Sequence, residues 1–136
     1  MKDSNFNIIT KTKKDPSDTM SSGSFLKIKN VILDLSYELE LIFVSAKESK
    51  KLNKQYRNKD KPADVLSFPI DKKTGQIFIS QNTAKKDAHN FNMSHKDFIL
   101  YLFIHGCLHL NGLDHGKKMD LLEKKLLKQF GVKKII

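Results

Sequence analysis

Residues 98–104 constrain the fold most, because they form the longest apolar run of the chain, Phe-Ile-Leu-Tyr-Leu-Phe-Ile. We expect a helix from His95 to about Asn111 around this run, with Ser94 as its N-cap. On a helix the run is apolar on nearly every side, and a helix without a polar face is a buried one. This helix should therefore cross the core, and the rest of the chain must pack around it.

Three of the five histidines follow the apolar run at the spacing His-x3-His-x5-His, namely His105, His109 and His115. Residues four apart lie one turn apart on one face of a helix, so His105 and His109 can hold one ion from the same side. His115 can join them only if the helix ends and the chain turns back. Gly112 accepts the left-handed conformation that such an ending needs. Three imidazoles that leave a fourth position open are typical of a catalytic zinc site.

The other residues near the histidines limit the chemistry. Cys107 is turned by about 200° from His105 on a helix, so we exclude it as a ligand and expect a small buried hydrophobe. The spacing also matches the metallopeptidase pattern His-Glu-x-x-His-x-x-Gly-x-x-His, but Gly106 stands where those enzymes carry their general base. This argues against a peptidase, and we expect Gly106 to leave open space beside the metal. We expect His89 and His95 to be exposed or locally bonded.

Length and composition bound the class of protein. The 136 residues predict a single domain, with a partly irregular segment over residues 1–24. One cysteine excludes an internal disulfide and favours the cytoplasm. The apolar runs are too short to cross a bilayer, and we expect no membrane partner. The net charge of +10 favours nucleic acid as a partner, although a lysine-rich genome would produce the same charge without a function.

The order of helix and strand patterns predicts an α+β fold. We expect a small mixed β-sheet of about four strands, covered by helices, with the metal ligands on the buried central helix. A hairpin should join the last two strands, and Pro69 should lie at an edge of the sheet. The expected strands are 6–10, 39–44, 64–70 and 76–79, and the expected helices are 25–35, 46–56, 81–89, 95–111 and 117–130, with Ser24, Ser45 and Ser80 as further N-caps.

Two long motifs resemble the YbeY family, the zinc-dependent endoribonucleases of ribosomal RNA maturation. Residues 105–115, HGCLHLNGLDH, are similar to the family's HGxLHLxGYDH, and residues 52–69, LNKQYRNKDKPADVLSFP, to its LNxxYRxxDxPTDVLSFP. Residues 75–80, GQIFIS, resemble GDIxIS, and Met119 and Glu123 follow as in the family. The resemblance covers about residues 40–130. It departs from the pattern at Ala63, Gln76 and Leu113, none of which is a metal ligand in that pattern.

The resemblance implies that His105, His109 and His115 bind one Zn²⁺ per chain and that Arg57 is catalytic. It also implies the same α+β fold, with the metal in a groove between the buried helix and the sheet. The chemistry suits Arg57, because a guanidinium is always charged and pairs bidentately with phosphate.

Two residue roles have alternatives. From the sequence alone, Arg57 could instead form a surface ion pair with Asp60 or Asp64. Asp114 could hydrogen-bond a ligand imidazole, or it could cap the turn after the helix. The sequence does not decide between these roles.

The resemblance further implies a single-strand-specific, metal-dependent endoribonuclease that acts in 16S rRNA 3′-end maturation and ribosome quality control. Its partners would be precursor rRNA and the ribosome, in the cytoplasm. The alternative is a zinc-containing ribosome assembly or binding factor with little or no turnover. The sequence shows no obvious general base, so attack by water and attack by the RNA 2′-hydroxyl are both open.

Overall fold

The computed structural model describes residues 2–3, 5–12 and 22–133. Its elements are β1 (Lys2–Asp3), β2 (Phe6–Thr10), α1 (Ser22–Leu33), β3 (Glu38–Val44), α2 (Ala46–Arg57), β4 (Val65–Asp71), β5 (Thr74–Ser80), α3 (Gln81–Ala88), the 3-10 helix η2 (His89–Phe91), α4 (His95–Leu110) and α5 (Lys117–Gln129). The expected irregular segment 1–24 contains β1, β2 and the start of α1, and its residues 1, 4 and 13–21 lie outside the described residues.

The strands form one mixed sheet in the order β1-β2-β3-β5-β4. β2, β3 and β5 are parallel, and β1 and β4 add antiparallel strands at the two edges. The predicted α+β class is confirmed, and the two-residue β1 joins the four expected strands. Pro69 lies in edge strand β4, as predicted, because an edge tolerates a residue that has no N–H to donate.

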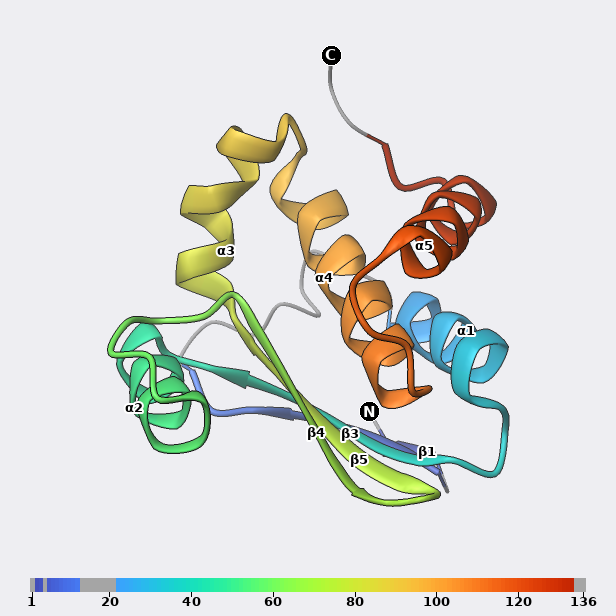
Figure 1. Ribbon diagram of the computed structural model, residues 1–136, viewed down its shortest axis with the longest axis horizontal. Helices are drawn as coiled ribbons and strands as arrows, with labels where there is room; N and C mark the ends of the chain where they lie inside the picture. The colour runs from blue at the N-terminus through green and yellow to red at the C-terminus, as the bar shows by residue number, and fades with distance from the viewer. Residues whose placement is uncertain (1, 4, 13–21, 134–136) are drawn as a thin grey trace.

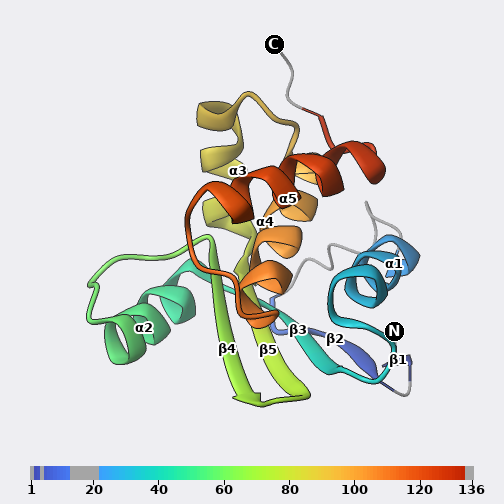
Figure 2. The same cartoon turned by 45° about the vertical axis from the view of Figure 1, so that its right-hand side comes forward.

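Helices α1, α4 and α5 lie on one side of the sheet, and α2 lies on the other side of the strands (Figures 1 and 2). Most residues of α4 are buried, which confirms the expected central helix. Phe103 of α4 packs on Phe25 of α1 and Phe6 of β2, with ring centroids 5.1 and 6.0 Å apart. No helix within the described residues is long and apolar enough to span a membrane.

Three of the four predicted N-cap residues stand at helix starts, and one does not. The hydroxyls of Ser45 and Ser94 accept the backbone N–H three residues later, as N-caps do. Ser80 also occupies the predicted N-cap position of α3, but its hydroxyl bonds the Thr83 hydroxyl instead of a backbone N–H. The prediction for Ser24 is wrong, because α1 already includes residue 22 and Ser24 lies in its first turn.

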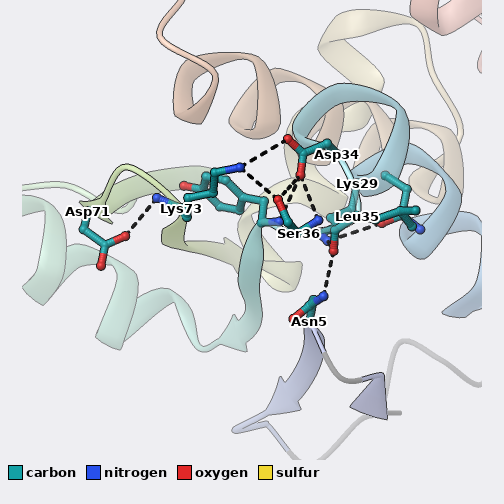
Figure 3. A network of polar contacts seen from close by, with 9 residues as sticks. Asn5, Lys29, Asp34, Leu35, Ser36, Asp71 and Lys73 are labelled. Atoms are coloured by element: carbon teal, nitrogen blue, oxygen red, sulfur yellow. Dashed lines mark hydrogen bonds and ion pairs between the residues drawn. The ribbon is translucent and has the colours of Figure 1, made fainter.

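The turn between α1 and β3 is held by a network of polar contacts (Figure 3). Asp34 has a positive φ of 72°, and its carboxylate accepts bonds from the N–H and the hydroxyl of Ser36. Lys73, from the β4–β5 hairpin, donates to the Ser36 hydroxyl at 2.9 Å. The buried Lys29 and Asn5 both donate to the carbonyl of Leu35. These contacts tie α1, β3 and the hairpin together at this end of the sheet.

Candidate metal centre

The structure brings His105, His109 and His115 together at the C-terminal end of α4. One ring nitrogen from each lies within 4.8 Å of the others. The Nε2 atoms of His105 and His109 are 3.1 Å apart. Two imidazole nitrogens on one tetrahedral ion, at about 2.0–2.1 Å from it, are about 3.3 Å apart. The two helix histidines are therefore already close to the separation that a shared ion requires.

The chain reverses after α4 through a left-handed turn at Gly112. This glycine has a φ of +88°, and its N–H donates to the carbonyl of His109. The N–H of Leu113 donates to the carbonyl of Leu108 at 3.1 Å, which together with the first bond forms the usual left-handed helix ending. The turn brings His115 back beside the helix histidines, as the spacing predicts.

Each helix histidine is oriented by a hydrogen bond at its other ring nitrogen. Nδ1 of His105 lies 2.8 Å from Oε2 of Glu123 in α5, and Nδ1 of His109 lies 2.9 Å from the carbonyl oxygen of Leu113. When Nδ1 donates in these bonds, Nε2 keeps its lone pair free toward the cluster. Among the described residues, Glu123 and the Leu113 carbonyl are the Nδ1 partners of the two helix histidines. Asp114, which the sequence suggested for such a contact, does not bond either of these Nδ1 atoms.

The protonation state of His109 favours binding of a metal ion. Burial, together with the nearby His105, lowers the pKa of His109. The neutral imidazole that results is the form that binds a metal ion. Cys107 lies between these histidines in the sequence but is fully buried, and burial raises the pKa of its thiol. The structure therefore leaves Cys107 outside the cluster, as predicted.

The histidines open into a cleft of 490 Å³ between α4 and the segment that joins α2 to β4. Three cationic residues of this segment and of the end of α2, Arg57, Lys59 and Lys61, line the cleft together with the three histidines. The centre and the second motif of the sequence, which are far apart along the chain, thus form two walls of one site.

Arg57 ends α2 and reaches the free edge of β4. Its Nη2 donates to the carbonyl of Ser67 at 2.8 Å, and its guanidinium carbon lies 5.1 Å from the centroid of the Phe68 ring. The alternative ion pair with Asp60 or Asp64 is not found among the described residues, and Asp60 lies beside two lysines of α2 instead. Most N–H donors of the Arg57 guanidinium therefore remain available to a ligand in the cleft.

The segment after α2 is held by side chains that sequence reasoning did not single out. The buried Asn53 donates to the carbonyl of Lys61 at 2.9 Å, and the Ser49 hydroxyl bonds the backbone of Ala63. Asn58 ends the helix in the left-handed conformation. The Ser49 hydroxyl bonds the main chain of Ala63, so this contact does not depend on the hydroxyl that the family pattern carries at position 63.

The expectation that Gly106 leaves open space beside the metal is wrong. Gly106 is buried against the sheet, where a Cβ would lie 2.9 Å from Oγ of Ser67 and 3.1 Å from Cδ1 of Ile77. The Ser67 hydroxyl also donates to the Gly106 carbonyl at 3.1 Å. Position 106 is turned by about 100° from His105 on the helix, so it faces the strands rather than the cleft.

This fold and this centre define a class of small α+β proteins in which a buried helix and the turn after it present three histidines to a basic cleft. The sequence model of one family, described as Endoribonuclease YbeY, matches residues 7–131. The chain belongs to the YbeY family, which confirms the resemblance seen in the two motifs.

Individual relatives agree with the family match. A protein of Nautilia profundicola named Endoribonuclease YbeY is 43% identical over 112 residues, which cover 77% of this chain and 79% of the relative. The protein of that name from Pelagibacter ubique is 36% identical over 127 residues, covering 88% and 82%. A Thermotoga maritima protein of known solution structure superposes with a TM-score of 0.62 at 29% identity, covering 92% of this chain and 88% of that one.

Proposed function

We propose that this protein is a metal-dependent endoribonuclease that cuts single-stranded RNA. Membership of the YbeY family and the names of the relatives support the endoribonuclease activity. One observation carries the metal dependence. The Nε2 atoms of His105 and His109 face each other at 3.1 Å, while both Nδ1 atoms are occupied by other partners.

The ligands of the ion are His105, His109 and His115, and the ion is one Zn²⁺ per chain. An all-imidazole donor set suits zinc, and a tetrahedral ion with three protein ligands keeps one position open. When bound, the ion supplies Lewis-acid polarisation of a phosphoryl oxygen of the substrate.

The remaining chemistry belongs to residues of the opposite wall. Arg57 binds the scissile phosphodiester through its N–H donors and offsets the negative charge that grows in the transition state. Its hydrogen bond to the Ser67 carbonyl and its contact with Phe68 hold the guanidinium in place before the substrate arrives. Lys59 and Lys61, which also line the cleft, bind the flanking phosphates.

The size of the cleft favours an unpaired strand. A volume of 490 Å³ has room for about one or two nucleotides. An unpaired strand can place its phosphodiester beside the histidines. In a duplex, the complementary strand would collide with the walls of the cleft. We propose that the natural substrate is the 3′ end of precursor 16S rRNA, in maturation and in ribosome quality control in the cytoplasm. The family resemblance and the net charge of +10 support this assignment.

The competing function is a zinc-containing ribosome assembly or binding factor with little turnover. To distinguish the two, the purified protein and its His105→Ala and His109→Ala variants are incubated with a structured RNA that carries an unpaired 3′ tail. We expect the parent protein to cut the tail and both variants to lose most of the cleavage. Equal cleavage by all three proteins would indicate a contaminating nuclease and would favour the binding factor.

The product ends of the same reaction identify the attacking group. A 2′,3′-cyclic phosphate shows attack by the RNA 2′-hydroxyl, because water cannot form that ring. A simple phosphate end that is present from the first turnover shows attack by water. A substrate with one 2′-deoxy nucleotide at the cleaved bond provides the control, since only attack by the 2′-hydroxyl requires that group.

A further inference from the structure

Tyr56, at the end of α2, places an exposed aromatic ring directly before Arg57. The residue is 56% exposed, and it is one of the exposed large hydrophobic residues of the described part of the chain. One side of its ring contacts Phe68 of β4, with the ring centroids 5.2 Å apart at 60°. The rest of the residue is exposed to solvent beside the edge strand β4, next in sequence to Arg57, which lines the cleft.

The Tyr56 ring belongs to a chain of aromatic contacts on the sheet. Phe68 packs in turn on Phe78 of β5, with centroids 5.7 Å apart and a T-shaped geometry. The Arg57 guanidinium lies over the same Phe68 ring. Tyr56 and Arg57 therefore share the Phe68 ring at the edge strand β4, and Arg57 is the member of this group that lines the cleft.

The surroundings identify the kind of ligand that such a ring would take. Arg57, Lys59 and Lys61 line the adjoining cleft, and a phosphate-bearing chain is the ligand that matches them. An unpaired nucleobase has a flat face, and proteins that bind single strands stack such bases on exposed aromatic rings. An exposed aromatic ring could also bind a protein partner, but the three cationic residues of the neighbouring cleft favour RNA.

We propose that Tyr56 is a stacking platform for an unpaired nucleobase next to the nucleotide whose phosphate Arg57 binds. The proposal rests on the proposed function and adds a subsite to it. The strand passes over the edge of β4, with one base on the ring and the neighbouring phosphodiester in the cleft. The subsite explains a preference for single strands in a second way, because a base within a duplex has no free face for Tyr56.

The test uses the full chain loaded with zinc and a set of short single-stranded RNAs in which one nucleotide at a time is abasic. Loss of one base stack corresponds to a change of about tenfold in affinity. We expect Tyr56→Ala to raise KM about tenfold while kcat stays within about twofold. One abasic position should raise KM of the parent protein equally, and at that position Tyr56→Ala should have no further effect.

Three further variants isolate the ring. Tyr56→Trp keeps a flat aromatic face and should bind as the parent does. Tyr56→Leu keeps an apolar contact for Phe68 but loses the face, and it should behave as Tyr56→Ala. Phe91→Ala removes another exposed aromatic ring, away from the cleft, and should leave KM unchanged. Thermal unfolding of each variant shows whether the fold is intact.

The outcomes separate this proposal from the proposed function. Cleavage with an unchanged KM in Tyr56→Ala overturns the stacking subsite and leaves the endoribonuclease in place. An effect of Tyr56→Ala that persists on every abasic substrate overturns it too, because the ring would then act only by supporting Arg57. If no protein of the set cleaves RNA, the proposed function fails, and fluorescence anisotropy with the same oligonucleotides still decides whether Tyr56 binds a base.

Discussion

At the scale of single residues, the candidate centre is defined as much by the partners of the histidines as by the histidines. Glu123 and the Leu113 carbonyl fix the Nδ1 atoms of the two helix histidines, so each Nε2 points at its neighbour. The histidine spacing predicts the cluster because helix geometry alone brings positions 105 and 109 together. The sequence could not identify the Leu113 carbonyl, since a backbone group has no residue pattern.

Glu123 should set the affinity for the metal without binding it. Glu123→Gln keeps the shape of the side chain but removes the charge that stabilises the His105 N–H, so we expect the metal affinity to fall by about tenfold. Competition against a chelating dye measures this. Glu40→Gln is the control, because Glu40 bonds Gln76 on β5 and does not contact the histidines. An unchanged affinity in Glu123→Gln would contradict this role for Glu123.

Arg57 should be needed for cleavage and not for metal binding. Arg57→Ala removes the group that binds the phosphodiester, and we expect kcat to fall about 100-fold with one equivalent of metal retained. Arg57→Lys keeps the charge but loses the bidentate geometry, so its cleavage rate should lie between those of the parent protein and Arg57→Ala. Cleavage assays and metal analysis of the same preparations provide both readouts. An Arg57→Ala protein as active as the parent would return Arg57 to a surface role.

At the scale of elements, the contact between α4 and the sheet determines which side of the helix the cleft occupies. Residue 106 packs on Ser67 and Ile77, and this contact leaves the histidines facing outward. The sequence predicts α4 well, because a helix that is apolar on nearly every side must be buried in the core. It does not predict how the helix is rotated against the sheet, and for that reason the expected open space at Gly106 was wrong.

The same limit explains which helix ends and strands could be predicted. Ser45 and Ser94 act as caps because their partners lie three residues away in the sequence. Ser80 instead bonds a second hydroxyl, an option that a propensity rule does not weigh against capping. β1 has two residues and exists only by pairing with β2, so no local pattern marks it.

Gly106→Ala tests the close packing of α4 on the sheet. An unhindered Gly-to-Ala change inside a helix stabilises it by about 1 kcal/mol. At Gly106 the added methyl group meets Ser67 and Ile77, and overpacking costs about 1–3 kcal/mol, so we expect a net loss of stability in urea unfolding. Adding Ser67→Ala removes the nearest atom and should recover part of the loss. A Gly106→Ala protein more stable than the parent would contradict this packing.

At the scale of the whole molecule, the site exists because the sheet brings two distant motifs together. β4 pairs with β5 as the edge strand, and this pairing carries the segment after α2 to the histidines at the end of α4. Each motif is visible in the sequence, and the family resemblance predicts that they share a site. The contact of Arg57 with Ser67 and Phe68 is a tertiary feature, which the sequence alone left open.

Stability should depend on pH through Asp64, whose carboxyl group hydrogen-bonds Asp87 of α3. Burial, together with Asp87, raises the pKa of Asp64 to about 7. The folded protein therefore holds a proton that the unfolded chain releases above about pH 4. The contribution of Asp64 is fully present below that pH and is lost as the pH rises toward 7.

Asp64→Asn removes this titration and can still donate to Asp87. The free energy of unfolding of the parent, minus that of Asp64→Asn, should fall between about pH 4 and pH 7. Urea unfolding across that range measures the difference, and Asp60→Asn, which changes an exposed carboxylate of the same segment, is the matched control. A difference that stays constant with pH would show that Asp64 does not keep its proton in the folded protein.

The claim that the three histidines form the metal centre of an endoribonuclease is tested most directly by titrating zinc into metal-free protein during cleavage of a single-stranded RNA. We predict that the rate rises from near zero and reaches its plateau at one zinc per chain. His109→Ala should bind little zinc and stay inactive throughout, whereas His89→Ala, at an exposed histidine outside the cluster, should follow the parent. Full cleavage by the metal-free protein, or an unaltered titration in His109→Ala, would contradict the account.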